Sequence, residues 1–266
     1  MPSPKPALAL VHGWGMNARV FDALVELLEA DFEVRALDLP GHGGREALAE
    51  NTLQSWADDL AQQLPDHSTL LGWSLGGQVA MRAALDHPHK IARLVLLAST
   101  PKFVSTADWA RGMAPADLED FGAALLADPQ ATLLRFLSLQ TRGMPGHTTP
   151  HGLQPVVDRS PLGGQKPLLQ QLRQTLLAAP QAQAEALSSG LTILHDTDLR
   201  AELPRLMQPA LVLHGALDTL TPPSAGAWLA ETLPAAHYIE FARAAHAPHL
   251  SHGLEVAAAI GRFVHG

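Results

Sequence analysis

Short apolar or alternating runs along the chain are separated by longer segments in which apolar residues recur every three or four positions. The first pattern is typical of strands in a buried sheet and the second of amphipathic helices. The predicted strands are Ala7–Val11, Phe32–Leu37, Ser68–Leu71, Leu94–Ala98, Pro209–Gly215 and Tyr238–Phe241. The predicted helices are Val20–Leu28, Leu53–Leu64, Gln78–Leu85 and Val256–Val264. This alternation predicts an α/β fold in which helices flank a mostly parallel central sheet.

The middle of the chain follows a different pattern. From Ala116 to about Leu187 the apolar spacing is mostly helical, and prolines interrupt it repeatedly. We interpret residues 102–190, approximately, as a helical cap inserted into a single domain that spans residues 1–266.

Composition narrows the classes of protein to which the chain can belong. With 266 residues, 47% of them hydrophobic, it can bury a large core, and the absence of cysteine excludes disulfides and thiolate chemistry. A net charge of −8 argues against nucleic acid as the main partner. The apolar run Ala7–Val11 is too short for a signal-peptide core, and no run approaches the ~20 residues of a membrane span. We expect a cytoplasmic monomer that does not contact membranes.

One short motif suggests nucleophilic chemistry. Ser74 lies between Gly72 and Gly76, after a predicted strand and before a predicted helix that should end near Asp86, because Pro88 follows. A serine on a sharp strand-to-helix turn needs glycines at these positions, since side chains there would collide with neighbouring backbone. The motif alone also fits an ordinary turn, but the strand and helix around it favour a nucleophile.

A serine nucleophile needs a base, an acid that orients the base, and donors for the oxyanion. Asp218 follows one of the last predicted strands and His246 follows the other, and the order Ser74, Asp218, His246 is that of hydrolases built on such a sheet. Asp196 and Asp198 compete for the role of the acid. They follow the predicted helical segment, where we expect them to cap or solvate a helix.

Two backbone amides are candidates for the oxyanion hole. They belong to Leu75, after the serine, and Trp14, in the loop after the first strand. The Trp14 side chain is equally expected as a packed aromatic, and both roles are compatible because the amide and the indole act separately.

The loop of His246 also contains His249 and His252, a spacing that suggests a metal site. We expect polar neighbours instead, with no metal and no cofactor, because Pro248 should prevent the regular helix that would align the rings and no carboxylate lies within the cluster.

Between Pro129 and Leu177, five basic residues stand against one acidic residue, a net charge of +4 in an otherwise acidic chain. The basic residues are Arg135, Arg142, Arg159, Lys166 and Arg173, and the acidic one is Asp158. One interpretation is an ordinary solvated surface, and the other is a docking patch for an acidic partner.

Five segments together resemble the BioH family of α/β-hydrolases, the pimeloyl-acyl carrier protein methyl ester esterases. They are His12–Asn17, Asp38–Gly41, Leu71–Gly77, Arg135–Thr141 and Ala244–Pro248, and the similarity spans nearly the whole chain, although Gly143–Gly164 departs from the family pattern. The resemblance implies an α/β-hydrolase fold and a triad of Ser74, Asp218 and His246. It further implies that Trp14 and Leu75 contact substrate and oxyanion, and that Phe136, Leu137, Ser138, Leu139 and Gln140 line the acyl site.

The family cleaves a methyl ester carried on acyl carrier protein, which is acidic, so the resemblance makes Arg135 and Arg142 candidates for carrier docking. We therefore expect a serine carboxylesterase that acts on a small acyl ester through an acyl-enzyme on Ser74. One alternative is another cap-bearing hydrolase that cleaves a carbon-carbon bond, a lactone or a peptide. A second is a hydrolase-fold protein that binds a ligand without turning it over.

Overall fold

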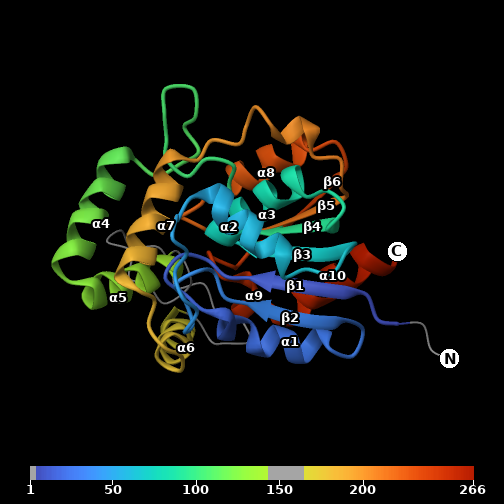
Figure 1. The fold of residues 1–266 in the computed structure, drawn as a ribbon, viewed down its shortest axis with the longest axis horizontal. Coiled ribbons are helices and arrows are strands. Elements are labelled where there is room, and N and C mark those ends of the chain that lie inside the picture. The colour runs from blue at the N-terminus through green and yellow to red at the C-terminus, as the bar shows by residue number, and fades with distance from the viewer. Residues whose placement is uncertain (1–3, 143–164) are drawn as a thin grey trace.

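The centre of the molecule is a six-stranded sheet (Figure 1), seen in a computed structural model that describes residues 4–142 and 165–266. All neighbouring strands are parallel, in the order β2-β1-β3-β4-β5-β6. The strands are β1 (Ala7–Val11), β2 (Glu33–Leu37), β3 (Ser68–Trp73), β4 (Ile91–Leu97), β5 (Ala210–Gly215) and β6 (Ala236–Phe241). Each predicted strand is present, and the parallel α/β fold is confirmed.

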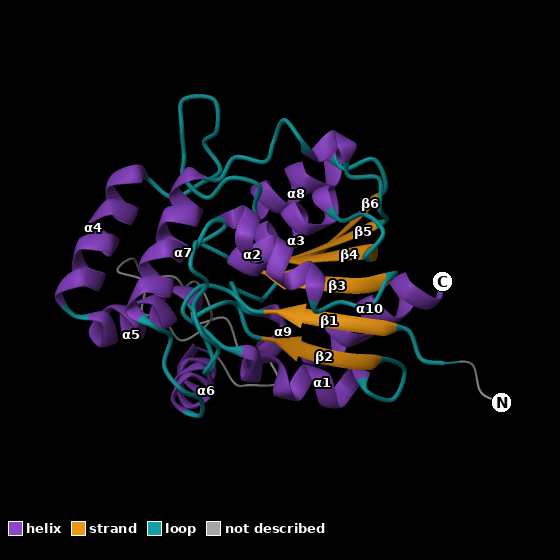
Figure 2. Cartoon of the chain, in the orientation of Figure 1, coloured by secondary structure: helices purple, strands orange, loops and turns teal. Residues whose placement is uncertain are grey.

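Helices cover both faces of this sheet (Figure 2). One face carries α2 (Leu53–Gln62), α3 (Leu75–Asp86) and α8 (Pro223–Thr232), and the other carries η1 (Ala18–Phe21), α1 (Asp22–Leu28), α9 (Pro248–Ser251) and α10 (Gly253–His265). Because helices shield it from both sides, every residue of β3 and of β5 is buried. Burial of each large aliphatic side chain here stabilises the fold by roughly 1.5–3 kcal/mol.

Among the described residues between β4 and β5 there are four α-helices, and we call them the inserted helices. They are α4 (Pro115–Ala127), α5 (Pro129–Gln140), α6 (Gln165–Leu177) and α7 (Ala184–Asp196). In Figure 2 they gather beyond the edge to which the strand arrows point. Prolines begin α4 and α5, where the missing N–H costs nothing, and the buried face of α4 carries Leu118, Phe121 and Leu125. The inserted helices therefore stand over the carboxyl edge of the sheet, where ligands bind in such folds.

The structure also differs from the expectations at particular elements. The helix α8, which begins at Pro223, was not predicted, and η2 (Leu203–Arg205) is a short additional turn before β5. Pro248 was expected to prevent a regular helix that would align His246, His249 and His252. The short helix α9 begins at that proline, in a first turn that tolerates it, but it contains only His249 of the three. Within the described residues, no helix is long and apolar enough to cross a membrane.

Candidate active site

Ser74 alone forms the turn between β3 and α3, with φ of 56° and ψ of −120°. A positive φ is rare for a residue with a side chain and stores strain. A Cβ atom on Gly72 would lie 2.3 Å from the carbonyl oxygen of Gly76, and one on Gly76 would lie 2.5 Å from that of His12. The predicted steric need for both glycines is therefore confirmed.

Hydrogen bonds from β4 and the residues after it hold this strained turn. The Ser74 amide donates to the Leu97 carbonyl at 3.0 Å, and the Ser99 hydroxyl donates to the Ser74 carbonyl at 2.8 Å. The carbonyl oxygen of Ala98, between them, also lies 3.1 Å from the Thr221 hydroxyl oxygen. The end of β4 thus contacts both the Ser74 turn and the loop after β5.

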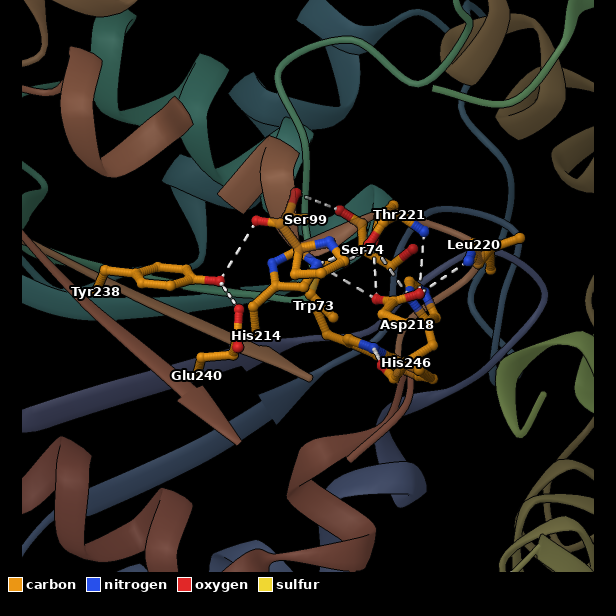
Figure 3. A network of polar contacts seen from close by, with 12 residues as sticks. Trp73, Ser74, Ser99, His214, Asp218, Leu220, Thr221, Tyr238, Glu240 and His246 are labelled. Atoms are coloured by element: carbon orange, nitrogen blue, oxygen red, sulfur yellow. Dashed lines mark hydrogen bonds and ion pairs between the residues drawn. The ribbon is translucent and has the colours of Figure 1, made fainter. Parts of the chain in front are cut away.

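Asp218 and His246 form a buried pair beside this turn (Figure 3). His246 Nδ1 lies 2.8 Å from Asp218 Oδ2, while Asp218 Oδ1 accepts the amides of Leu220 at 2.9 Å and Thr221 at 3.0 Å. Burial by itself would raise the pKa of Asp218, but the charge of His246 and the hydrogen bonds from His214 and His246 hold this pKa well below its usual range. The carboxylate therefore remains ionised.

The main chain of His246 is held from two sides. Its amide donates to the Gln140 carbonyl at the end of α5 at 3.2 Å, and its carbonyl accepts the Trp73 indole N–H at 2.8 Å. His246 Nε2 is buried and has no hydrogen-bond partner among the described residues, Ser74 included. With Nδ1–H bonded to Asp218, Nε2 is the ring nitrogen that can accept a proton.

The loop after β1 lies directly against Ser74, since a Cβ atom on Gly13 would come 3.0 Å from that of Ser74. Within the described residues, neither the Trp14 nor the Leu75 amide has a hydrogen-bond acceptor. His12 supports this loop: its Nδ1 lies 2.8 Å from the Gly13 carbonyl oxygen, and its Nε2 accepts the Leu39 amide at 3.1 Å. Burial lowers the pKa of His12 to about 4, so the ring is neutral at pH 7.

The Trp14 side chain packs against the inserted helices. It is 1% exposed, donates to the Leu187 carbonyl at 2.8 Å, and meets the rings of Phe121 and Phe136 edge to face at 5.4 Å and 4.9 Å. A Cβ atom on Gly190 of α7 would lie 2.7 Å from the indole. The side chain is therefore a packed aromatic, as one of the two interpretations expected, while its amide remains available.

The five residues expected to line an acyl site all lie on α5. Phe136, Leu137 and Gln140 are buried, whereas Ser138 and Leu139 are half-buried. Phe136 contacts Trp14, and the Gln140 carbonyl contacts His246, so α5 meets two separate parts of the site. Arg135 and Arg142 are exposed on α5 and just after it.

The alternative candidates for the acid and for a metal site have other contacts in the structure. Asp198 pairs with Lys102 at 2.9 Å and with Arg200 at 2.7 Å, so it is engaged outside the Asp218–His246 pair. His249 is buried against Trp73, with ring centroids 4.7 Å apart, and burial lowers its pKa to about 3. No group of three or more His, Asp or Glu side chains in the described ranges is arranged to hold a metal ion.

Sequence reasoning missed four residues around this site: Trp73, Ser99, His214 and Thr221. Trp73, Ser99 and Thr221 each form a hydrogen bond with the serine turn or with the Asp218–His246 pair. His214 forms one with the Thr221 carbonyl, and its Nε2 lies 3.4 Å from Asp218 Oδ2. Thr221 illustrates the difficulty, because no pattern in the chain distinguishes it from Thr219, which is exposed in the same loop.

Comparison with known proteins places this geometry in a family. Residues 6–253 match the family model described as the alpha/beta hydrolase fold. An esterase from Exiguobacterium antarcticum superposes with a TM-score of 0.83, covering 99% of this chain and 93% of its own at 22% identity. A hydrolase from Pseudomonas aeruginosa has a TM-score of 0.78 at 27% identity, covering 98% and 91%. These structures agree with the α/β-hydrolase fold.

Two curated relatives are more similar in sequence. A pimeloyl-acyl carrier protein methyl ester esterase from Aromatoleum aromaticum is 40% identical, and the match covers 98% of this chain and 99% of that protein. The chain belongs to this esterase family. A protein of the same name from Nitrosomonas europaea is 39% identical over 92% of this chain and 90% of its own length. Membership of the esterase family confirms the resemblance deduced from the sequence segments.

Proposed function

We propose that this protein is a serine carboxylesterase that hydrolyses the methyl ester of pimeloyl-acyl carrier protein in biotin synthesis. The observation that carries the proposal is the buried Asp218–His246 pair, joined at 2.8 Å, beside the strained Ser74 turn. Family membership supports the substrate, since the relatives named above carry that activity in their names. No metal or cofactor is needed for this chemistry.

The proposed reaction follows from the positions of the groups. Ser74 Oγ attacks the ester carbonyl while His246 Nε2 accepts its proton, and the amides of Leu75 and Trp14 stabilise the oxyanion. Collapse of the tetrahedral intermediate breaks the bond to the methoxy group, which leaves as methanol with the proton from His246. Water then attacks the acyl-enzyme by the same route and releases the carboxylic acid. Asp218 holds the imidazole in the productive tautomer throughout.

In this proposal the inserted helices belong to a cap formed by roughly residues 102–190. Phe136 to Gln140 lie beside the acyl chain. Contacts from α5 to Trp14 and His246 support this arrangement. A carrier protein would approach the exposed basic residues of the cap. Those in the described part of the basic stretch are Arg135, Arg142, Lys166 and Arg173, whereas Asp158 and Arg159 lie outside the described residues.

Reversing two of these charges tests the docking proposal. The double variant Arg135→Glu, Arg142→Glu should lower kcat/KM for the carrier-bound ester by about tenfold, because repulsion slows encounter with an acidic carrier. Turnover of a free methyl ester should change less than about twofold. Lys5→Glu with Arg205→Glu is the matched control, since both residues are exposed and precede strands, at the opposite edge of the sheet. Equal losses on carrier-bound and free esters would contradict docking at this surface.

The physiological substrate is tested by rescue of a biotin-requiring strain that lacks its own esterase. Growth is expected with the wild-type chain and not with Ser74→Ala. An active esterase that fails to rescue would indicate another substrate, as in the cap-bearing hydrolases of carbon-carbon bonds, lactones or peptides. Absence of Ser74 labelling by a fluorophosphonate would favour a protein that only binds its ligand.

The proposal includes a monomer that works in the cytoplasm, where carrier-bound acyl esters are made. Sedimentation of the purified protein and fractionation of expressing cells test these two points.

A further inference from the structure

We propose that Thr221 is a positioning residue for the reaction, one whose hydroxyl holds the Asp218 carboxylate in the plane that His246 requires. The inference rests on the proposed esterase mechanism and adds a residue to it. Thr221 lies three positions after Asp218 in the loop between β5 and α8, and it is 1% exposed.

Thr221 contacts both oxygens of the carboxylate. Its amide donates to Asp218 Oδ1 at 3.0 Å, and its hydroxyl lies 2.8 Å from Asp218 Oδ2. The same hydroxyl oxygen is 3.2 Å from His246 Nδ1, so it touches both members of the pair (Figure 3). An amide and a hydroxyl from one residue thus define the orientation of the carboxylate on both sides.

The hydroxyl has a single proton and two acceptors within reach. Asp218 Oδ2 at 2.8 Å is nearer than the Ala98 carbonyl at 3.1 Å, and it carries negative charge, which strengthens the bond. The proton therefore goes to Asp218. This places the Thr221 hydroxyl and His246 Nδ1–H as donors on one carboxylate oxygen, and His214 Nε2 lies 3.4 Å from the same oxygen.

His214 in β5 holds Thr221 in place. His214 Nε2 lies 2.7 Å from the Thr221 carbonyl oxygen, and because a carbonyl only accepts, Nε2 must carry the proton. His214 Nδ1 has no partner among the described residues and faces Gly226, where an added Cβ would lie 2.3 Å away. The ring is therefore confined between Thr221 and α8. The side chain of threonine is also stiff about χ1, which further limits the positions of the hydroxyl.

Loss of the hydroxyl has two consequences. The carboxylate loses a fixed donor and with it part of its orientation, which lowers the rate of the step that uses His246. Asp218 Oδ2 also becomes a stronger acceptor for the imidazolium, which should move the acid limb of the kcat/KM profile. The titratable groups next to His246 in the described structure are Asp218, His214 and His249, and none of them is altered by a substitution at Thr221.

The test compares Thr221→Val, which keeps the shape and removes the hydroxyl, with Thr221→Ser, which keeps the hydroxyl. For hydrolysis of p-nitrophenyl acetate, Thr221→Val should lower kcat by about fivefold with KM within about twofold of wild type. The acid limb of its kcat/KM profile should move to higher pH. Thr221→Ser should restore both the rate and the profile, and Thr219→Val, in the same loop but exposed, should match wild type.

Several outcomes would overturn the inference. A purely structural role predicts a lower melting temperature for Thr221→Val with an unmoved pH profile, and an unchanged kcat would contradict the positioning role outright. If the wild-type chain itself does not hydrolyse the ester, the proposed function fails, and the inference is then tested by NMR titration of His246. A raised His246 pKa in Thr221→Val would still support the contact, and an unchanged pKa would refute it.

Discussion

Ser74→Ala is expected to lower the turnover of a short p-nitrophenyl ester by about ten-thousand-fold or more. The variant removes the nucleophile that forms the acyl-enzyme and leaves the oxyanion donors, the Asp218–His246 pair and the inserted helices in place. Alanine tolerates the positive φ of this turn no worse than serine, and the side chain removed is a single oxygen. The loss should therefore come from chemistry, with a melting temperature close to that of wild type.

The matched control is Ser224→Ala, which removes an equivalent hydroxyl from an exposed position on α8 and should retain full activity. Burst kinetics on the wild type provide a second check, since an acyl-enzyme releases one equivalent of p-nitrophenol ahead of steady turnover. Undiminished turnover by Ser74→Ala would refute the mechanism.

Asp218→Asn should lower kcat by about ten-thousand-fold, because it reverses the tautomer of the base. The Leu220 and Thr221 amides both donate to Oδ1. They would select the amide oxygen of the new side chain and direct its NH₂ group toward His246. His246 Nδ1 must then accept a hydrogen bond, so the ring proton moves to Nε2. With that proton bound, Nε2 can no longer accept the proton of Ser74.

Asp198→Asn is the control for this variant, since it neutralises a carboxylate that pairs with Lys102 and Arg200, outside the Asp218–His246 pair. It should change kcat less than about twofold. If Asp218→Asn retained wild-type activity, the acid of the mechanism would have to be another carboxylate. Because the pKa of Asp218 lies well below its usual range, this carboxylate should not contribute to the acid limb of the wild-type kcat/KM profile.

Local patterns were sufficient for much of the fold. Continuous apolar runs identified the strands because helices on both faces of the sheet leave no polar side, as the full burial of β3 and β5 illustrates. Their ends were less certain: β3 extends to Trp73, and α3 begins at Leu75, at the serine turn itself. The helix α8 went unpredicted because the prolines before it resemble a loop, although proline is well suited to a first helical turn.

The serine turn could be derived from the chain alone, since its requirement for Gly72 and Gly76 is a steric property of neighbouring backbone. The order of Ser74, Asp218 and His246 along parallel strands also follows from sequence, because parallel strands end at one edge. What fills the space around these residues depends on segments far apart in the chain. The Trp14 indole donates to the carbonyl of Leu187, which lies 173 positions further along the chain, and Asp218 pairs with His246, 28 positions further along. Such contacts leave no periodic trace, so folding alone assigns Thr221 to the carboxylate and His249 to the apolar packing around Trp73.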